Sequence, residues 1–367
     1  MAQSISFFEP TVETLRKMGI EQVIVSSPGE QLDSFADRYA LISHSVNMER
    51  HISPLKDLKS LWQLVKVFRK EKPDMVHSMT PKAGLLCMMA AWLTRVPVRV
   101  HTFTGLIFPS ATGLKQKILI LTDRITCACA THIIPEGEGV KNDLISYHIT
   151  RKPLKVLGYG NVRGIDLNRF DPDNRENIEA AEKIRKPDIF TFIFIGRLVG
   201  DKGINELVEA FTNLNKEMLR TRLILVGAYE SDLDPLKSDT VEQINRNPAI
   251  LSVGQQSDVR PWLLASDALV LPSYREGFPN VVIEAGAMRL PSIVTDINGS
   301  REIIIEGRNG TIIPPRDTDA LFSAMRRFVT SDLSSMIEET RPLIASRYER
   351  NYVASCLIEF YKEILPK

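Results

Sequence analysis

The sequence predicts an α/β protein that contains two open parallel sheets with helices on both faces. Short runs rich in β-branched residues alternate with longer amphipathic stretches, which is the pattern of repeated β-α-β units. Each half of the chain contains one set of such alternating runs. Residues 161–189, which are polar and lack a strand-like run, separate the two sets. A length of 367 residues also fits two domains, at about 150 residues per domain.

The first half contains four strand-like runs with helical stretches between them. These runs are residues 21–27, 74–79, 98–104 and 131–135. A long helix is predicted to begin at Ser53-Pro54-Leu55, because Pro is favoured at the first helical position. Apolar residues then recur at helical spacing, and basic residues occupy the same segment. The apolar positions are Leu58, Leu61, Trp62, Val65 and Phe68.

The second half contains five strand-like runs, most of which end in Gly, Ser or Pro. They are residues 190–196, 221–227, 249–254, 267–273 and 291–296. The polar residues 161–189 lack such a run. Residues 348–365 are predicted to form one amphipathic helix. We therefore expect an N-terminal domain over 1–160, a connection over 161–189, a C-terminal domain over 190–345 and a final helical segment over 346–367.

Composition excludes several classes of protein. Apolar residues make up 44% and charged residues 25%, as in ordinary globular proteins. The longest apolar run, residues 83–94, is too short to cross a bilayer, which takes about 20 residues. The first residues lack a signal-peptide pattern, and four cysteines do not form a disulfide framework in a chain of this length. We expect a cytoplasmic protein.

The net charge of +1 conceals an asymmetry between the two halves. Residues 1–160 contain 20 Lys and Arg against 14 Asp and Glu, whereas residues 161–367 contain 26 against 31. A basic half joined to an acidic half indicates different partners, and ordinary variation of a solvated surface is the alternative. The basic amphipathic segment over 53–72 adds the hypothesis of peripheral attachment to the inner face of the plasma membrane. Its alternative is a domain helix with solvated charges.

Two motifs in the second half carry the chemistry. In the first, Glu276 and the loop residues Gly277, Phe278, Pro279 and Asn280 follow a strand, and Glu284 follows in the next helix. Pro279 is expected at the first helical position, so the helix would direct its positive end at the loop and favour a phosphate there. A common Glu-Gly turn before a helix is the alternative reading.

The second motif places Arg197 and Lys202 directly after the run 190–196. The carboxyl end of a parallel strand faces the crevice in which α/β sheets bind ligands. Arg can hold phosphate oxygens with its planar fork, and Lys adds a point charge. Two solvated loop charges are the alternative.

Together these segments resemble the retaining glycosyltransferases of family 4, which have the GT-B fold. The likeness is densest over 196–211, 223–227, 266–296 and 298–304, and the Arg-x4-Lys pair and the Glu-x7-Glu pattern occur in the family's order. The resemblance implies two Rossmann-like, doubly wound domains facing a central cleft, with the last helix crossing back to the first domain. It further implies that Arg197 and Lys202 hold the nucleotide diphosphate, Glu276 faces the donor sugar and Glu284 binds the ribose.

The first half resembles the branch that builds bacterial surface polysaccharides, over 26–30, 48–61, 74–86 and 96–106. Many members have His-Gly where this chain has Thr104-Gly105, and that His contacts the donor sugar. His101 lies three residues earlier and on the opposite face of the strand, so we interpret it as a buried, hydrogen-bonded histidine. Thr104 and Gly105 remain the candidate substrate-binding pair in this half.

The resemblance implies transfer of a sugar, with retention of configuration, from a UDP-sugar to a hydroxyl of a lipid-linked glycan. No cofactor is expected beyond this co-substrate. Because two fixed cations neutralise the diphosphate, we also expect no metal requirement. Alternatives are a UDP-sugar 2-epimerase of the same fold and, because of Thr104, a homologue that binds a nucleotide sugar but is catalytically weak.

The beginning of the chain differs from a domain of this family, which opens with a strand and a Gly-rich turn. Val12, Leu15 and Met18 instead follow helical spacing, and Gly19 is a natural helix stop before the run 21–27. We therefore expect that the first strand is missing and that Met1 lies inside a longer ancestral reading frame. A natural variant with another segment in its place is the alternative.

Other motifs are weaker. Three Asp-x-Asp pairs, Asp171/Asp173, Asp232/Asp234 and Asp317/Asp319, are interpreted as solvated turns because none follows a strand as a Mg²⁺ or Mn²⁺ site would. Cys127, Cys129 and His132 lie in an apolar run without a fourth ligand, so core packing is the better interpretation. The modest charge argues against nucleic acid as a partner.

Overall fold

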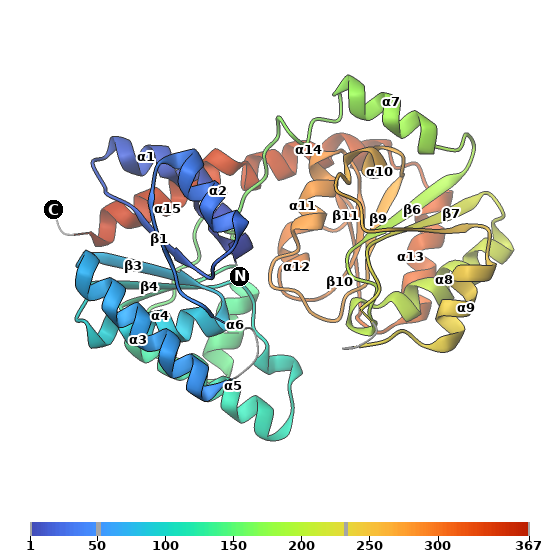
Figure 1. The fold of residues 1–367 in the computed structure, drawn as a ribbon. Helices are drawn as coiled ribbons and strands as arrows, with labels where there is room; N and C mark the ends of the chain where they lie inside the picture. The colour runs from blue at the N-terminus through green and yellow to red at the C-terminus, as the bar shows by residue number, and fades with distance from the viewer. Residues whose placement is uncertain (1, 49–52, 231–233, 366–367) are drawn as a thin grey trace. The chain divides into compact units, whose positions relative to one another are not determined.

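The computed structural model describes residues 2–48, 53–230 and 234–365, which form two compact units (Figure 1). Unit 1 contains the described residues up to Gly164 together with those from Arg350 onward, and unit 2 spans Ile165–Glu349. Most of the stretch expected as a connection therefore packs within unit 2, where its helix α7 (Arg175–Ile184) contacts α10 (Arg260–Leu264). The final helix belongs to unit 1.

Unit 1 contains two separate parallel sheets. The strands are β1 (Val23–Ser26), β2 (Ile42–Ser45), β3 (Met75–Met79), β4 (Val98–Phe103) and β5 (His132–Pro135). In one sheet β1 pairs with β2, and in the other β4 lies between β3 and β5. The segment before β1 is helical, so among the described residues it adds no strand to either sheet.

Helices cover both faces of the three-stranded sheet of unit 1. The helices of unit 1 are the 3-10 helix η1 (Ala2–Thr11), α1 (Val12–Lys17), α2 (Glu30–Tyr39), α3 (Pro54–Glu71), α4 (Pro81–Leu93), the 3-10 helix η2 (Phe108–Ser110), α5 (Gly113–Cys129), α6 (Glu138–Ser146) and α15 (Arg350–Ile364). Side chains alternate along β4: Val98 and Val100 pack with Leu357 and Tyr361 of α15, and Phe103 packs with α3, α4 and α5 on the other face.

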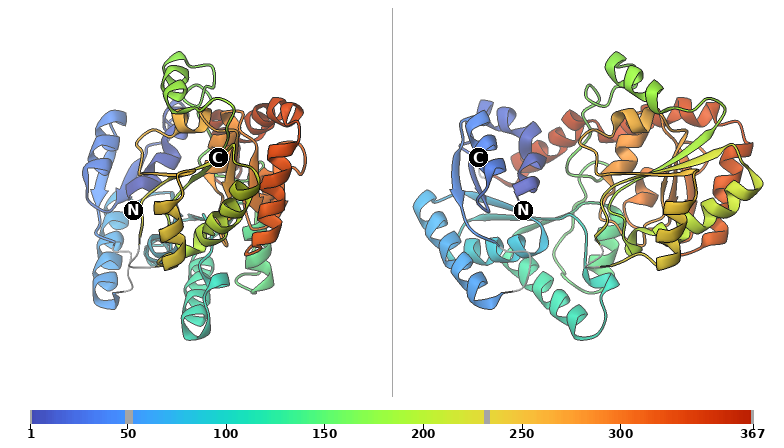
Figure 2. Two further views of the ribbon diagram at one scale, coloured as in Figure 1. Left: turned by 90° about the vertical axis from the view of Figure 1, so that its right-hand side faces the viewer. Right: turned by 45° about the vertical axis from the view of Figure 1, so that its right-hand side comes forward.

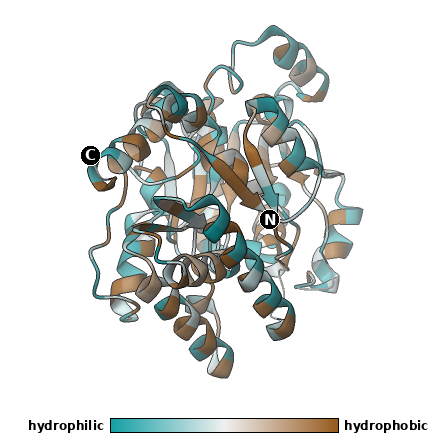
Figure 3. Cartoon of the chain, turned by 60° about the vertical axis from the view of Figure 1, so that its left-hand side comes forward, coloured by the Kyte–Doolittle hydropathy of each residue, from teal (hydrophilic) through white to brown (hydrophobic). Residues whose placement is uncertain are grey.

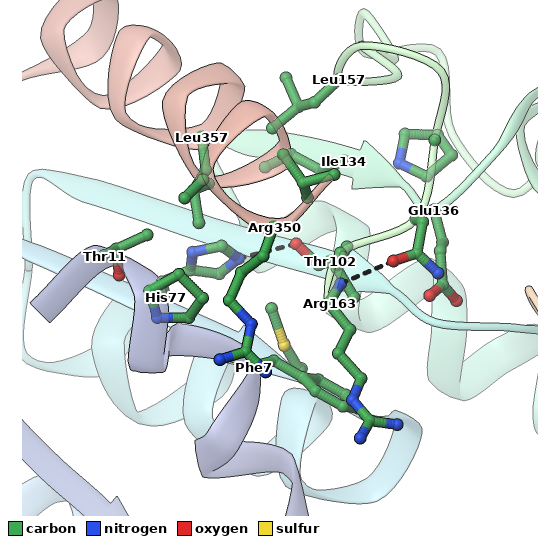
Figure 4. A pocket seen from close by; sticks show the side chains of 18 residues that line it. Phe7, Thr11, His77, Thr102, Ile134, Glu136, Leu157, Arg163, Arg350 and Leu357 are labelled. Carbon is green, nitrogen blue, oxygen red and sulfur yellow. Dashed lines mark hydrogen bonds between the residues drawn. The ribbon is translucent and has the colours of Figure 1, made fainter. Parts of the chain in front are cut away.

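Two histidines of this sheet are held by hydrogen bonds. His77 of β3 is hydrogen-bonded to the Tyr361 hydroxyl (2.5 Å) and the Thr102 hydroxyl (2.7 Å), beneath Leu357 of α15 in a small pocket (Figure 4). His101 of β4 is hydrogen-bonded to the Ser78 hydroxyl (2.8 Å) and is almost completely buried. The prediction of a buried, hydrogen-bonded His101 is confirmed.

Unit 2 contains one six-stranded parallel sheet. Its strands are β6 (Phe190–Ile195), β7 (Thr221–Val226), β8 (Ile250–Gly254), β9 (Ala268–Leu271), β10 (Ser292–Thr295) and β11 (Gly310–Ile313). The order in space is β11-β10-β9-β6-β7-β8. The chain thus builds outward from β6 on one side through β7 and β8, and from β9 on the other side through β10 and β11. The boundary between β6 and β9 is the topological switch point of the sheet.

Helices cover both faces of this sheet as well (Figure 1 and Figure 2). Besides α7 and α10 they are the 3-10 helix η3 (Gly200–Lys202), α8 (Ile204–Glu217), α9 (Ser238–Arg246), α11 (Asn280–Ala287), α12 (Ser300–Ile303), α13 (Thr318–Thr330) and α14 (Ser334–Tyr348). The sheet is the centre of a large apolar core, to which β6, β7, β9 and β10 each contribute completely buried side chains. The strands read as continuous apolar runs for this reason.

The predicted fold class is confirmed, and all nine predicted strands are present. Two strands were not predicted, β2 and β11. The sequence of β2, Ile-Ser-His-Ser, is largely polar, and its strand conformation depends on pairing with β1. The structure bears out the helix expected before β1, since Val12 and Leu15 are buried and Gly19 has a φ of +76°. No helix among the described residues is both long and apolar enough to span a bilayer.

These two histidines predict that acid destabilises unit 1. Burial lowers the pKa of His77 and of His101 to about 3, and the charge of His101 contributes at His77. The neutral rings therefore contribute stability that is fully present above about pH 6.5 and is lost as the pH falls towards 3. Each ring adds a slope of about 1.4 kcal/mol per pH unit within that window. Urea unfolding between pH 4 and 6 should show a shallower pH dependence for His77→Gln and His101→Gln, and unchanged slopes would contradict the prediction.

Candidate functional site

The residues of both predicted motifs lie at the switch point of unit 2. Arg197 and Lys202 occupy the loop between β6 and α8, and Glu276 occupies the loop between β9 and α11. Because β6 and β9 are parallel neighbours, their carboxyl ends meet at one edge of the sheet, and the two loops emerge side by side. Ligands of open α/β sheets bind at this position.

Three contacts join the two loops. The Lys202 ammonium donates to Glu276 Oε1 at 2.5 Å, and both side chains are less than one-fifth exposed. The Tyr274 amide donates to the Asp201 carbonyl oxygen at 2.9 Å. The Arg275 guanidinium also donates to Asp201 Oδ2, at 3.0 Å. The predicted cation and the predicted carboxylate are therefore direct partners.

The backbone of Gly203 brings the loops into contact. This residue has a φ of +68° and precedes α8, and a Cβ atom in its place would lie 2.1 Å from the carbonyl oxygen of Pro272. Only glycine accepts this conformation and this distance without strain. The close approach fixes where Lys202 lies relative to the loop that contains Glu276.

Arg197 has a different partner. Its guanidinium donates to Glu230 Oε2 at 2.8 Å, and both side chains are nearly half exposed. Glu230 lies in the loop after β7, the strand adjacent to β6. The hydrogen bond to Glu230 is the main cause that raises the pKa of Arg197, and the carboxylates of Asp201 and Glu276 contribute. Arg197 thus lies in a locally acidic environment.

The first turn of α11 forms another side of the site. The helix begins at Asn280, and Pro279 is its N-cap, one residue earlier than the first helical position expected for it. The backbone of Gly299, with a φ of +74°, packs so closely on this loop that a Cβ atom there would lie 2.5 Å from the Gly277 carbonyl oxygen. The Phe278 ring is buried against Tyr348, with ring centroids 5.6 Å apart, so only its backbone is available at the loop.

The remaining predicted residues are placed as follows. Glu284 lies one turn into α11 and is half-buried, on the same helix whose N-terminus follows the Glu276 loop. Thr104 and Gly105 belong to unit 1, where they follow the carboxyl end of β4, and both are half-buried. The structure thus brings Arg197, Lys202 and Glu276 together within unit 2, while the Thr104-Gly105 pair belongs to the other unit.

The prediction that the aspartate pairs are solvated turns does not hold for Asp234. This residue is half-buried, and its Oδ2 accepts from the Asp201 amide at 2.5 Å. Asp317 accepts from the Ala320 amide at 2.8 Å as the N-cap of α13, and Asp173 pairs with Arg289. Asp232 lies outside the described residues. Within residues 2–48, 53–230 and 234–365, no three His, Cys, Asp or Glu side chains gather as metal ligands would.

Sequence reasoning missed three members of this site. Glu230 and Arg275 pair with site residues, and Tyr274 packs beneath the Arg316 guanidinium at 4.5 Å from its ring centroid. Burial and a hydrogen bond to Glu206 raise the pKa of Tyr274 above its usual range. Arg275 directly precedes Glu276, and this adjacency could have identified it from the sequence. The sequence gives no such signal for Glu230, because its contact with Arg197 depends on the pairing of β7 with β6.

Two family models match the sequence. The family described as "Glycosyl transferases group 1" matches residues 189–331, and the family described as "Glycosyl transferase 4-like domain" matches residues 7–160. The matches fall on unit 2 and on unit 1, respectively.

Individual proteins are similar over most of the chain. The capsular polysaccharide biosynthesis glycosyltransferase CapM of Staphylococcus aureus is 33% identical over 333 residues, covering 90% of this chain and 86% of that protein. The UDP-Gal:alpha-D-GlcNAc-diphosphoundecaprenol alpha-1,3-galactosyltransferase of Escherichia coli is 33% identical over 287 residues, covering 77% and 73%. The crystal structure of Anabaena Alr3699/HepE in complex with UDP has a similar fold, with a TM-score of 0.79, 16% identity and coverage of 98% and 95%.

The close approach at Gly203 generates a prediction about stability. Gly203→Ala should destabilise unit 2 by about 2 kcal/mol or more, because it combines an unfavourable positive φ with a clash against a backbone carbonyl. Gly254→Ala is the matched control, since Gly254 has the same φ of +68° and open space around it. Chemical denaturation of both variants separates the two causes. Equal losses of unfolding free energy would show that the Pro272 contact is unimportant.

Proposed function

We propose, from the premise that this chain belongs to the family 4 glycosyltransferases, that it transfers a sugar from a UDP-sugar to a hydroxyl group of a lipid-linked glycan. Membership follows from the two family matches and from 33% identity to CapM over most of both chains. The chain is accordingly a glycosyltransferase with the GT-B fold. The donor, the acceptor and the stereochemistry are the proposed part.

The observation that carries the proposal is the pair of cations at the switch point. Arg197 and Lys202 follow β6, and the N-terminus of α11 follows the neighbouring strand β9, so three sources of positive charge lie at the same edge of the sheet. This arrangement suits a diphosphate. A nucleoside diphosphate would place its ribose hydroxyls toward Glu284 of the same helix, as we proposed from the sequence. The UDP named in the Anabaena HepE structure supports uridine as the nucleoside.

The chemical task is to stabilise a leaving group. As the glycosidic bond stretches, negative charge grows on the diphosphate and positive charge grows on the sugar ring. We assign the first charge to Arg197, Lys202 and the first turn of α11, with the loop backbone of Gly277, Phe278, Pro279 and Asn280 beside it. Glu276 is assigned to position the donor sugar and steady the second charge. The acceptor hydroxyl attacks from the side of the leaving phosphate, which accepts its proton, so configuration is retained.

Donor binding requires the site to exchange partners. In the structure the Lys202 ammonium is already bonded to Glu276, and Arg197 is already bonded to Glu230. The incoming diphosphate replaces carboxylates as the partner of both cations. Glu276 is thereby released for the sugar. Because two protein cations neutralise the diphosphate in this scheme, we propose that catalysis needs no metal ion, so activity should survive EDTA.

The acceptor is proposed from the relatives. One is named for capsular polysaccharide biosynthesis and another for a diphosphoundecaprenol-linked acceptor. By analogy we propose a lipid-linked glycan in bacterial polysaccharide biosynthesis, with the enzyme at the cytoplasmic face of the plasma membrane. Thr104 and Gly105, at the carboxyl end of β4, are the candidate substrate contacts of unit 1.

An epimerase is not favoured. That reaction needs acid and base groups that exchange protons. In unit 1, His101 is buried and His77 is half-buried, and both are held by hydrogen bonds. A homologue that binds nucleotide sugars but is catalytically weak, an alternative prompted by Thr104, would bind UDP without turnover.

Assaying UDP-Glc, UDP-Gal, UDP-GlcNAc and UDP-GalNAc with a diphosphate-linked acceptor tests the proposed glycosyl transfer. Failure of all four donors would contradict it.

The diphosphate assignment predicts separate effects of substitutions on binding and turnover. Arg197→Ala and Lys202→Ala should each weaken UDP binding by about 1.5–3 kcal/mol, the size of a charge-assisted contact. Glu276→Gln should reduce kcat more than it changes UDP affinity. Isothermal titration calorimetry and steady-state kinetics measure the two effects. Arg246→Ala in α9, with the same change in charge, is the control, and parental UDP affinity in Arg197→Ala would refute the assignment.

The exchange of partners predicts a gain of affinity. Glu230 competes with the donor diphosphate for Arg197, so Glu230→Gln should tighten UDP binding. The pair is half exposed, which limits the gain to about 1 kcal/mol, or roughly fivefold in Kd. Glu209→Gln, at an exposed position of α8, makes the same change in net charge and should have a smaller effect. Weaker binding of UDP by Glu230→Gln would show that Glu230 orients Arg197 rather than competes for it.

A further inference from the structure

Asp201 lies at the centre of the contacts around the candidate site, because its amide, its carbonyl and its carboxylate each bond to a different residue. The amide donates to Asp234 Oδ2 at 2.5 Å, in the segment between β7 and α9. The carbonyl oxygen accepts from the Tyr274 amide at 2.9 Å. The carboxylate Oδ2 accepts from Nε and Nη2 of Arg275 at 3.2 and 3.0 Å. Three loops of unit 2 therefore meet at this residue.

The Asp201 carboxylate is close to both cations that are assigned to the diphosphate. It belongs to the residue directly before Lys202, and its charge contributes to the raised pKa of Arg197. The Asp201 side chain is 23% exposed. Its second oxygen, Oδ1, is buried and accepts no hydrogen bond from a protein group in the described residues. An acidic group with an unused acceptor atom thus lies beside the two cations.

Two ion pairs of opposite polarity cross the same junction between the loops. Asp201 pairs with Arg275, and the next residue on each loop makes the reverse pair, Lys202 with Glu276. The Arg275 side chain is 46% exposed, whereas that of Lys202 is 15% exposed. Hydrophilic residues are spread over both units (Figure 3), but at this edge of the sheet acidic and basic side chains gather in pairs.

The charge of Asp201 opposes the binding of an anion unless it is balanced. A diphosphate that binds to Arg197 and Lys202 competes with every carboxylate that reaches the same cations. The carboxylates that pair with these cations give them up in the proposed exchange of partners. Asp201 cannot move away, because its amide and its carbonyl are fixed by neighbouring loops. Arg275 bonds to the carboxylate itself and offsets its charge.

We propose that Arg275 controls the affinity for the donor by neutralising Asp201, so that this carboxylate does not hold Arg197 or Lys202 when a diphosphate arrives. Arg275 is thus a positioning residue, which acts through Asp201 and does not itself bind the diphosphate. The inference rests on the proposed function, since it names what protects the cations of that same site. A mechanical tie between the two loops is the competing role. The two roles predict opposite results when both charges are removed together, because the tie stays broken while the charge balance returns.

Binding of UDP to the full chain tests the proposal, measured by isothermal titration calorimetry at low and at high salt. Arg275→Gln should raise the Kd for UDP about fivefold at low salt, because it leaves the Asp201 carboxylate without its charge partner beside the two cations. Salt should reduce this loss, since added ions screen exposed charges. Arg275→Lys keeps the charge and should bind UDP within about twofold of the parent.

Removing both charges separates the two roles. Asp201→Asn keeps the shape of the side chain but removes its charge, so UDP should bind about threefold more tightly. The double variant of Asp201→Asn with Arg275→Gln restores the charge balance and should bind UDP within about twofold of the parent. If the double variant binds UDP as weakly as Arg275→Gln, the pair is a tie or Arg275 itself binds the diphosphate, and the proposal is overturned.

Arg289→Gln is the matched control. Arg289 makes a bidentate pair with Asp173 beyond the C-terminal end of α11, the end opposite to the Glu276 loop, and its side chain is also 46% exposed. Its replacement removes the same charge and should leave the Kd for UDP unchanged.

Urea unfolding of every variant identifies any loss of stability, and Asp201→Asn, Arg275→Lys and the double variant keep the test decisive if Arg275→Gln does not fold. Parental UDP affinity in a folded Arg275→Gln would overturn this inference alone. A parent chain that does not bind UDP would instead contradict the donor of the proposed function, and this inference with it.

Discussion

The candidate site depends on the contact between the backbone of Gly203 and the carbonyl oxygen of Pro272. This contact joins two loops that leave neighbouring strands at the point where the strand order reverses. It sets the separation of Lys202 and Glu276, which lie one residue before Gly203 and four residues after Pro272, respectively. Arg275 and Tyr274 then bond to Asp201 across the same junction. On the far side, Gly299 supports the loop that precedes α11. Two glycines and a parallel sheet therefore hold in place a site whose chemical groups come from segments more than 70 residues apart.

Charge balance explains why the two cations have partners before any ligand binds. Arg197, Lys202 and the positive end of α11 lie at the same edge of the sheet, where like charges repel one another. Glu230 and Glu276 compensate for this repulsion in the unliganded site. The two pairs differ in their surroundings, since the Lys202–Glu276 pair is largely buried and the Arg197–Glu230 pair is half exposed. Exchange of a carboxylate for a phosphate is therefore more favourable at the exposed Arg197–Glu230 pair. Separating an exposed ion pair costs less free energy than leaving one member of a buried pair without its partner.

The two faces of the three-stranded sheet in unit 1 pack against different helices. One face of its three-stranded sheet packs against α15, and the His77–Tyr361 hydrogen bond attaches the last helix to the strands. The opposite face packs against α3, α4 and α5, whose outer surface exposes apolar and basic side chains. In the proposed function the acceptor meets unit 1 at the carboxyl end of β4, where Thr104 and Gly105 lie.

The sequence alone determined the fold class, nine of the eleven strands in the described residues and the family, because buried parallel strands read as apolar runs and the motif spacings are local properties. It also determined that Arg197, Lys202 and Glu276 follow strands. The tertiary structure decided their partners: Lys202 bonds to Glu276, and Arg197 bonds to Glu230, a residue without a motif of its own. Strand β2 likewise depends on β1, since its own sequence is largely polar. The reason is common to these cases. Periodicity records how each residue relates to its immediate neighbours, whereas ion pairs between loops and the pairing of edge strands depend on the order of strands in the sheet.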